Sequence, residues 1–201
     1  MKNSICGVVV SAGLSSRMGQ FKPLLPYGGT TVIESVIGSL LSGGAQRVIL
    51  VLGHRGGEIE ASLKGSPHRD HVDLVYNRDY RQSEMIDSYR MGLAQAVRYE
   101  MVLLQPGDMP AVNPEIIKKL ITLMVENSYE IVYPSNGTRR LHPALIRGGF
   151  IPAILDRPAP MGLGKLLTEL SLKTGYLLTE DRGNALDLDT MEDYFDLLRK
   201  R

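Results

Sequence analysis

Short apolar segments recur along the chain, and they constrain its fold more than any other feature. Residues Ile5 to Val10, Val48 to Leu52 and Met101 to Leu104 are apolar with no polar alternation, and Val72 to Tyr76 and Glu130 to Tyr133 repeat the pattern less strongly. Continuous apolar segments of this length are typical of parallel strands that are buried on both faces. The pattern favours a parallel sheet inside the molecule.

Helical patterns separate these apolar segments. The spacing of apolar residues predicts helices over Thr31 to Ser42, Gly57 to Lys64, Met85 to Arg98 and Pro114 to Asn127. Asn113, Pro114 and Glu115 give the last of these helices a capping residue, a proline in the first turn and an early acid. Alternation of strands and helices predicts right-handed βαβ units in a doubly wound sheet. We therefore expect an α/β fold with three layers, Rossmann-like, with a mostly parallel sheet.

The regular alternation of strand and helix patterns changes after about residue 135. A turn is expected at Asn136 to Thr138, strands at His142 to Ile146 and Gly175 to Thr179, and helices at Gly164 to Leu172 and Met191 to Lys200. The chain has no internal repeat and no long linker. We expect a single domain over residues 1–201, with a first part of about 1–112, a second part of about 113–201, and a small substrate-side elaboration in the last third.

Composition excludes several classes of function. Among 201 residues, 23 Lys and Arg oppose 22 Asp and Glu, for a net charge of +1. A polybasic surface for nucleic acid or anionic lipid is therefore not expected. The single cysteine, Cys6, excludes an internal disulfide framework and a multi-cysteine zinc site. No apolar segment approaches a bilayer span and no signal peptide pattern precedes the first strand, so we expect a cytoplasmic protein.

A loop rich in small residues follows the first predicted strand, from Ser11 to Pro26. Open α/β sheets bind ligands at this end of a strand. Small residues let backbone N–H groups approach a phosphate, and Arg17 with Lys22 can neutralise a polyphosphate. The spacing of Gly13 and Gly19 fits neither a P-loop nor a dinucleotide fingerprint. From spacing alone, a glycine-rich surface turn is the alternative.

Acidic residues stand at two further points. Asp108 follows an apolar strand inside a turn made by Gly107 and Pro110, at the same sheet edge as the loop. An isolated aspartate in a turn would be interpreted as a cap. Beside an anion-binding loop, a magnesium ligand is the better interpretation of Asp108. Asp187 and Asp189 share one face of an extended segment. One of them, or Thr190, could cap the helix that follows.

The segment VVSAGLSSRMGQFKPLLP, residues 9–26, resembles the signature of nucleotidyltransferases with a MobA-like domain, and is most similar to the molybdenum cofactor cytidylyltransferases. GDMP at 107–110 resembles the metal-binding aspartate motif of that family, and DLDT at 187–190 a second acidic motif. The resemblance implies catalytic roles for Lys22, Arg17 and Asp108. It implies Mg²⁺ ligands at Asp108 and Asp189, with Asp187 as the alternative to Asp189. Nucleotide contacts are implied at Ser11, Ala12, Gly13, Leu14, Ser15, Arg17, Lys22, Ser88 and Gly107.

Two later segments extend the resemblance. Residues 77–93 resemble an element that closes over the nucleotide, in which Ser88 hydrogen-bonds the base; a solvent-facing helix serine is the alternative. Residues 138–143 resemble an acceptor-side segment, so that Arg139 and Arg140 meet an anionic acceptor and His142 shapes its pocket; a basic hairpin tip is the alternative. Residues 162–165 lack the acid that the family often has there, which leaves the acceptor open.

The implied reaction is nucleotidyl transfer with Mg²⁺ from a nucleoside triphosphate, with CTP favoured, to a phosphorylated acceptor such as molybdopterin or the molybdenum cofactor, with release of pyrophosphate. A molybdoenzyme or maturation factor would be the protein partner, and no nucleic acid or membrane is implied. The alternatives are a guanylyltransferase of the same cofactor, a sugar- or polyol-phosphate nucleotidyltransferase, and a nucleotide-binding accessory protein without catalysis.

Overall fold

The computed structural model describes residues 4–14, 19–158, 160–170, 172–181, 183 and 187–199. Its elements in chain order are β1 (Ile5–Ser11), η1 (Lys22–Leu24), β2 (Pro26–Tyr27), β3 (Thr30–Thr31), α1 (Val32–Ser42), β4 (Arg47–Leu52), α2 (Gly56–Leu63), η2 (Arg69–His71), β5 (Val72–Tyr76), α3 (Met85–Ala96), β6 (Met101–Pro106), α4 (Pro114–Asn127), β7 (Ile131–Ser135), β8 (Ala144–Arg147), η3 (Gly148–Phe150), α5 (Ile151–Asp156), α6 (Gly162–Glu169), β9 (Thr174–Leu178) and α7 (Met191–Arg199). The strands and helices alternate as the sequence predicted.

Seven strands form one sheet in the order β5-β4-β1-β6-β8-β7-β9. β1 lies inside the sheet, where Val8 pairs in parallel with Ile49 of β4 and Leu104 of β6. β8 runs antiparallel to both of its neighbours, β6 and β7. The predicted α/β fold with a mostly parallel sheet is therefore confirmed, with one reversed strand in its second half.

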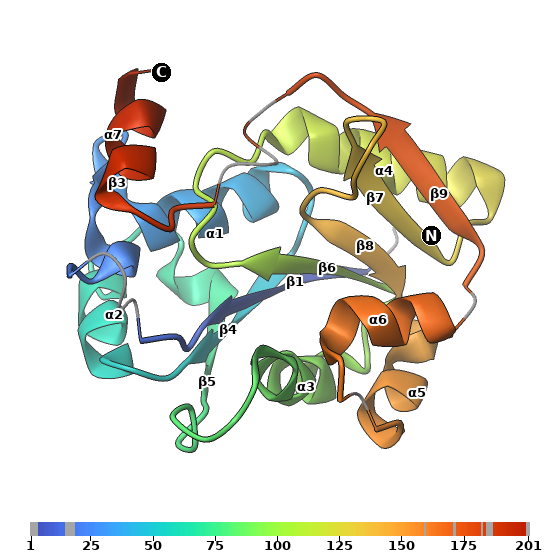
Figure 1. The fold of residues 1–201 in the computed structure, drawn as a ribbon, viewed down its shortest axis with the longest axis horizontal. Helices are drawn as coiled ribbons and strands as arrows, with labels where there is room; N and C mark the ends of the chain where they lie inside the picture. Colours follow the sequence, from blue (N-terminus) through green and yellow to red (C-terminus); the bar gives the residue numbers. More distant parts are fainter. Residues whose placement is uncertain are drawn as a thin grey trace.

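Helices cover both faces of the sheet (Figure 1). α1, α2 and α4 pack on one face, and α3, α5 and α6 pack on the other. Successive side chains of β6 point to opposite faces of the sheet. Leu103 therefore belongs to the apolar core on the first face and Leu104 to the apolar core on the second. A third, smaller apolar cluster joins α7 to the β2–β3 hairpin. This last contact brings the end of the described chain back beside the segment that follows β1 in the sequence.

Local signals explain where several helices begin. Thr31 and Glu34 form a reciprocal capping box at α1. The Asn113 side chain accepts the Glu115 N–H at α4, as the Asn-Pro-Glu sequence predicted. The helix α5 was not expected, because its segment was notable only for proline. Pro152 stands in its first turn, where a missing N–H costs nothing.

The strand order creates a crevice between β1 and β6. The connection that leaves β1 passes through α1 on one face, and the connection that enters β6 passes through α3 on the other face. Ligands of open α/β sheets bind at such a point, beyond the carboxyl ends of the strands. Among the residues that the structure describes, no helix has both the length and the hydrophobicity of a membrane span.

Candidate active site

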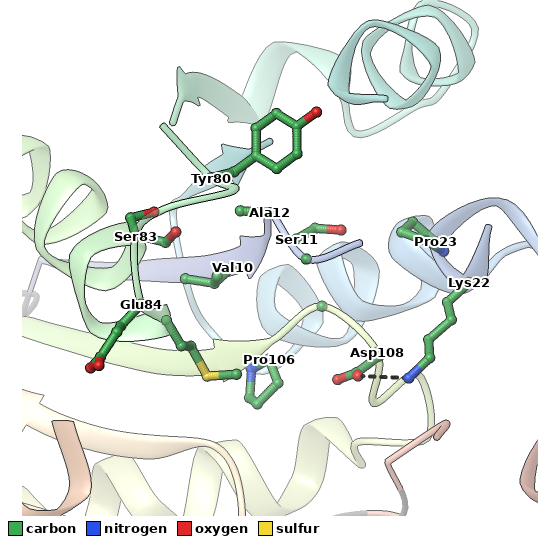
Figure 2. Close-up of a pocket in the computed structure, with 14 residues that line it drawn as sticks. Val10, Ser11, Ala12, Lys22, Pro23, Tyr80, Ser83, Glu84, Pro106 and Asp108 are labelled. Atoms are coloured by element: carbon green, nitrogen blue, oxygen red, sulfur yellow. Dashed lines mark ion pairs between the residues drawn. The ribbon is translucent and has the colours of Figure 1, made fainter. Parts of the chain in front are cut away.

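A cavity of about 230 Å³ opens at the carboxyl ends of β1 and β6 (Figure 2). It is lined by Val10, Ser11, Ala12, Gly13, Lys22, Pro23, Tyr80, Ser83, Glu84, Met85, Ser88, Pro106, Gly107 and Asp108. We call it the nucleotide cavity, for the role that the sequence predicted for this edge. Six of the expected site residues line it together with Asp108, so the switch point of the sheet brings the separate motifs into one place.

The turn after β6 approaches β1 closely. A Cβ at Gly107 would lie 2.9 Å from both the Ser11 Cβ and the Val10 carbonyl oxygen, so only glycine fits there without a shift. The Gly107 N–H donates to the Val10 carbonyl over 2.9 Å. This close contact holds Asp108 directly beside the end of β1.

Lys22 joins the two acidic motifs. Its ammonium Nζ lies 3.2 Å from Asp189 Oδ1 and 3.6 Å from Asp108 Oδ2, and its side chain is only 10% exposed. Figure 2 shows the lysine extending along the cavity to the Asp108 carboxylate. Burial raises the pKa of Asp108, while the Lys22 charge opposes that rise. The two carboxylates thus already hold one cation between them.

The groups around the Lys22 ammonium show whether a magnesium ion would fit between the two carboxylates. Mg²⁺ is commonly held by one or two carboxylates together with substrate phosphates and waters. Asp108 and Asp189 supply that donor set, and the Lys22 ammonium lies between them. No group of three or more acidic, histidine or cysteine side chains that could hold a metal occurs within the described ranges, so phosphate oxygens would have to complete the coordination.

The segment that carries Asp189 is held at both ends. Leu188 is fully buried in the apolar cluster between α7 and the β2–β3 hairpin, and its N–H donates to the Asp108 carbonyl over 3.1 Å. Thr190 Oγ1 accepts the Asp193 N–H, and Asp193 Oδ2 accepts the Thr190 N–H. Of the open capping candidates, Thr190 therefore takes the role at α7. Asp189 is left to reach Lys22, and Asp187 lines a neighbouring cavity.

Ser88 lies inside the molecule, with 2% of its surface exposed. Its Oγ accepts from Asn77 Nδ2 over 2.9 Å, and the same amide donates to Ser83 Oγ over 2.8 Å. The alternative of a solvent-facing helix serine is therefore wrong. Asn77 thus ties the loop between β5 and α3 to the helix through Ser83 and Ser88.

A second cavity, of about 450 Å³, adjoins the nucleotide cavity through Asp108, Met85 and Pro106. It is lined by the acids Asp108, Asp187 and Asp189 and by Arg139, Arg140 and His142. We call it the junction cavity. The structure therefore places the predicted acceptor residues on the same cavity as the predicted metal ligands, although they are distant in sequence.

Arg140 and His142 have distinct surroundings. The Arg140 guanidinium donates to Thr168 Oγ1 over 3.1 Å and to the Tyr176 hydroxyl over 3.2 Å, and lies 4.8 Å from the centroid of the Tyr133 ring. These contacts fix the plane of a cation that forms bidentate pairs with phosphate or carboxylate. Burial lowers the pKa of His142, which favours the neutral imidazole.

Some expected residues are not brought into the site by the described structure. Ser15 and Arg17 lie outside the described residues. Leu14 is 48% exposed and does not line the nucleotide cavity. Conversely, Tyr80, Glu84 and further residues of the cavity were not predicted individually, although the segment 77–93 was expected to close over the nucleotide, because they come from a loop whose course depends on tertiary contacts. Only Glu84 carried a local signal, since it forms a reciprocal cap with Asp87 at the start of α3.

Comparison with known proteins identifies the family of the chain. The family model of the MobA-like NTP transferase domain matches residues 7–174. The chain is 30% identical to molybdenum cofactor cytidylyltransferase of Escherichia coli (strain K12), over 93% of this chain and 92% of that protein. It is also 28% identical to nicotine blue oxidoreductase of Paenarthrobacter nicotinovorans, over 96% of each chain.

Solved structures agree with the fold. Rv0371c from Mycobacterium tuberculosis H37Rv superposes with a TM-score of 0.82 and 27% identity, covering 99% of this chain and 100% of that one. Rv0371c has also been solved in complex with manganese. The family model spans the nucleotide cavity and the arginine segment together. The chain therefore belongs to the MobA-like NTP transferase family.

Proposed function

We propose that the chain is a Mg²⁺-dependent cytidylyltransferase that transfers CMP from CTP to a phosphorylated acceptor of the molybdopterin type and releases pyrophosphate. The observation that carries the proposal is the Lys22 ammonium between Asp108 and Asp189, beside the small residues that end β1. The 30% identity to the Escherichia coli cytidylyltransferase, over 93% of this chain, supports CTP and the molybdenum cofactor as substrates.

In this proposal the nucleotide cavity holds the triphosphate. The backbone of Ser11, Ala12 and Gly13 approaches the nucleotide, and Ser88, which lines the same cavity, binds the base. Lys22 and Arg17 neutralise phosphate charge. Mg²⁺, held by Asp108 and Asp189, would neutralise charge on the α-phosphate and the departing pyrophosphate. Residues of about 1–112 thus bind the nucleotide, and those of about 113–201 bind the acceptor and close the site.

The chemical step needs position and charge more than proton transfer. An oxygen of the acceptor phosphate attacks the α-phosphorus in line, and the bond from that phosphorus to the oxygen bridging to the β-phosphorus breaks. The attacking oxygen is already anionic, so no general base is required. Arg139 and Arg140 hold the acceptor across the junction cavity, and the neutral His142 shapes its wall.

Replacement of Asp108 by Asn tests the proposal. The variant keeps the backbone carbonyl that Leu188 donates to, so we expect a folded protein. Pyrophosphate release with CTP, Mg²⁺ and acceptor should fall by about 10²–10³-fold, the usual effect of removing one electrostatic group. Asp70→Asn, an exposed aspartate on η2, is the matched control. Near-normal pyrophosphate release by Asp108→Asn would contradict the assignment.

Thermal denaturation with CTP, GTP, ATP or UTP, each with Mg²⁺, tests the base. Stabilisation by CTP alone supports the proposal, and stabilisation by GTP supports the guanylyl alternative. A triphosphate that binds without any pyrophosphate release would support an accessory role.

The full-length similarity to nicotine blue oxidoreductase favours one second candidate, an oxidoreductase that uses the same cavities. That activity releases no pyrophosphate, so the same assay separates the two.

A further inference from the structure

Tyr194 of α7 lines neither the nucleotide cavity nor the junction cavity. We propose that it is nevertheless a positioning residue for nucleotidyl transfer, because it fixes Asp189 relative to Lys22 and so holds this carboxylate ready for the metal. The inference rests on the proposed function and adds to it a residue that acts on the site from outside the cavities.

Tyr194 is 6% exposed and packs in the apolar cluster that joins α7 to the β2–β3 hairpin (Figure 1). Its hydroxyl donates to the Pro26 carbonyl over 2.6 Å, across 168 positions of the chain. Apolar contacts have no preferred direction and let two surfaces slide, whereas a hydrogen bond weakens steeply when its angle changes. The Tyr194 hydroxyl therefore fixes the register of α7 on the hairpin.

The segment that Tyr194 holds leads directly to Lys22. The turn η1 begins at Lys22, and the Leu25 N–H donates to the Lys22 carbonyl over 3.1 Å. Leu25 is buried in the same apolar cluster as Tyr194, and its own carbonyl accepts the Val32 N–H over 3.0 Å at the start of α1. The backbone from Lys22 to Pro26 is thus held between α1 and α7, so a shift of Pro26 would also shift Lys22.

The helix of Tyr194 leads to Asp189. Asp193 precedes Tyr194 in α7, and its Oδ2 accepts the Asp189 N–H over 3.2 Å and the Thr190 N–H over 2.7 Å. The backbone of Asp189 therefore moves with the first turn of α7. Asp189 Oδ1 lies 3.2 Å from Lys22 Nζ. Tyr194 thus joins, outside the cavities, the two segments that carry this ion pair.

Tyr194→Phe tests the role of the hydroxyl with little damage to the fold. The substitution keeps the ring in the apolar cluster and removes the bond to the Pro26 carbonyl, and Pro26 is exposed, so water can replace the lost donor. Mg²⁺ requires nearly ideal octahedral geometry of its ligands. A small shift of Asp189 should therefore weaken metal binding more than it weakens the fold.

Tyr99→Phe is the matched control. Tyr99 is 8% exposed, and its hydroxyl accepts from the Arg98 guanidinium over 3.3 Å. It precedes β6 and so stands at the opposite end of that strand from Asp108. Each variant loses one hydrogen bond of a buried tyrosine, so urea unfolding should show similar stabilities for the two.

The experiment measures Mn²⁺ binding to the full chain by electron paramagnetic resonance, in the presence of α,β-methylene CTP, an analogue that cannot release pyrophosphate. Tyr194→Phe should weaken the Mn²⁺ affinity about fivefold, the usual effect of losing one hydrogen bond. Tyr99→Phe should leave the Mn²⁺ affinity unchanged. An unchanged affinity in Tyr194→Phe, or an equal loss in Tyr99→Phe, would overturn the inference.

A double-mutant cycle with Asp189→Asn separates positioning from a general loosening of the fold. If Tyr194 acts through Asp189, Tyr194→Phe should weaken Mn²⁺ binding no further once Asp189→Asn is present. The same loss in both backgrounds would contradict the positioning role.

The unmodified chain distinguishes the two levels of the argument. If it binds no Mn²⁺ beside the CTP analogue, the proposed function fails and the inference fails with it. If it binds Mn²⁺ and Tyr194→Phe binds it equally well, only the inference about Tyr194 fails.

Discussion

Lys22 lies between Asp108 and Asp189, which we propose as ligands of a divalent cation, and its removal should therefore have opposite effects on metal and on nucleotide. In Lys22→Met the aliphatic stem keeps its packing but the ammonium between Asp108 and Asp189 is lost. The two carboxylates then lose the ammonium that lies between them. A divalent ion should bind this variant more tightly than it binds the unmodified chain, while CTP with Mg²⁺ should turn over more slowly.

The separations set the size of the effect. At 3.2 and 3.6 Å between the ammonium and carboxylate atoms, Coulomb's law gives about 5 kcal/mol per pair at an effective dielectric constant of about 20. The carboxylate side chains are 35% and 46% exposed, so water reduces each net contribution to about 1 kcal/mol. Release of that competition, about 2 kcal/mol for the two pairs, should tighten metal binding roughly thirtyfold. Loss of the cation should slow nucleotidyl transfer by about 10²-fold or more.

Electron paramagnetic resonance of free Mn²⁺ measures the metal affinity in the absence of nucleotide. Two controls accompany Lys22→Met. Lys22→Arg keeps the charge and should bind Mn²⁺ as weakly as the unmodified chain, and Lys118→Met removes only an exposed pair with Glu115. An Mn²⁺ affinity in Lys22→Met that is equal to or below that of the unmodified chain would refute the idea that Lys22 competes with the metal.

Three further outcomes follow from buried contacts. Ser88→Ala removes the hydroxyl that accepts from the Asn77 amide, so the free energy of unfolding in urea should fall by about 1 kcal/mol. CTP binding, measured by calorimetry, should also weaken. An unchanged CTP affinity would show that Ser88 is not part of the nucleotide site. Gly92→Ala places a Cβ 2.5 Å from Val8 Cγ1 and should cost about 1–3 kcal/mol in chemical denaturation. Burial lowers the pKa of His142, so on acidification the unfolded chain takes up this proton first and stability falls below about pH 6.5; His142→Gln should reduce that fall, and an identical pH profile would contradict it.

The sequence was sufficient for features that depend on local pattern. Continuous apolar segments predicted the buried parallel strands, because burial on both faces removes polar alternation. Helix starts at Asn113 and Thr190 followed from capping chemistry, although for Thr190 the pattern left two aspartates as competitors. Glycine before Asp108 was also a local signal, since the close approach of two backbones leaves no room for a Cβ.

The reversed strand β8 and the unexpected helix α5 show where local pattern was insufficient. The strand Ala144–Arg147, with three apolar residues and an arginine, carries no information about direction, which is set by the pairing with β6 and β7. Proline at Pro152 is compatible with a loop and with the first turn of a helix alike. Packing of Ile151 and Ile154 against the second core decides between them.

The amino-acid sequence by itself determined the α/β architecture, the loop of small residues at the end of β1 and the acids that could serve it, because each depends on neighbours in the chain. Tertiary structure decided that Lys22 stands between Asp108 and Asp189, which is 167 positions away. It also decided that residues of α3, β6, β8 and α6 enclose an apolar cavity beside the arginines. These arrangements depend on how segments that are distant in sequence pack together. The periodicity of apolar residues along the chain carries no information about that packing.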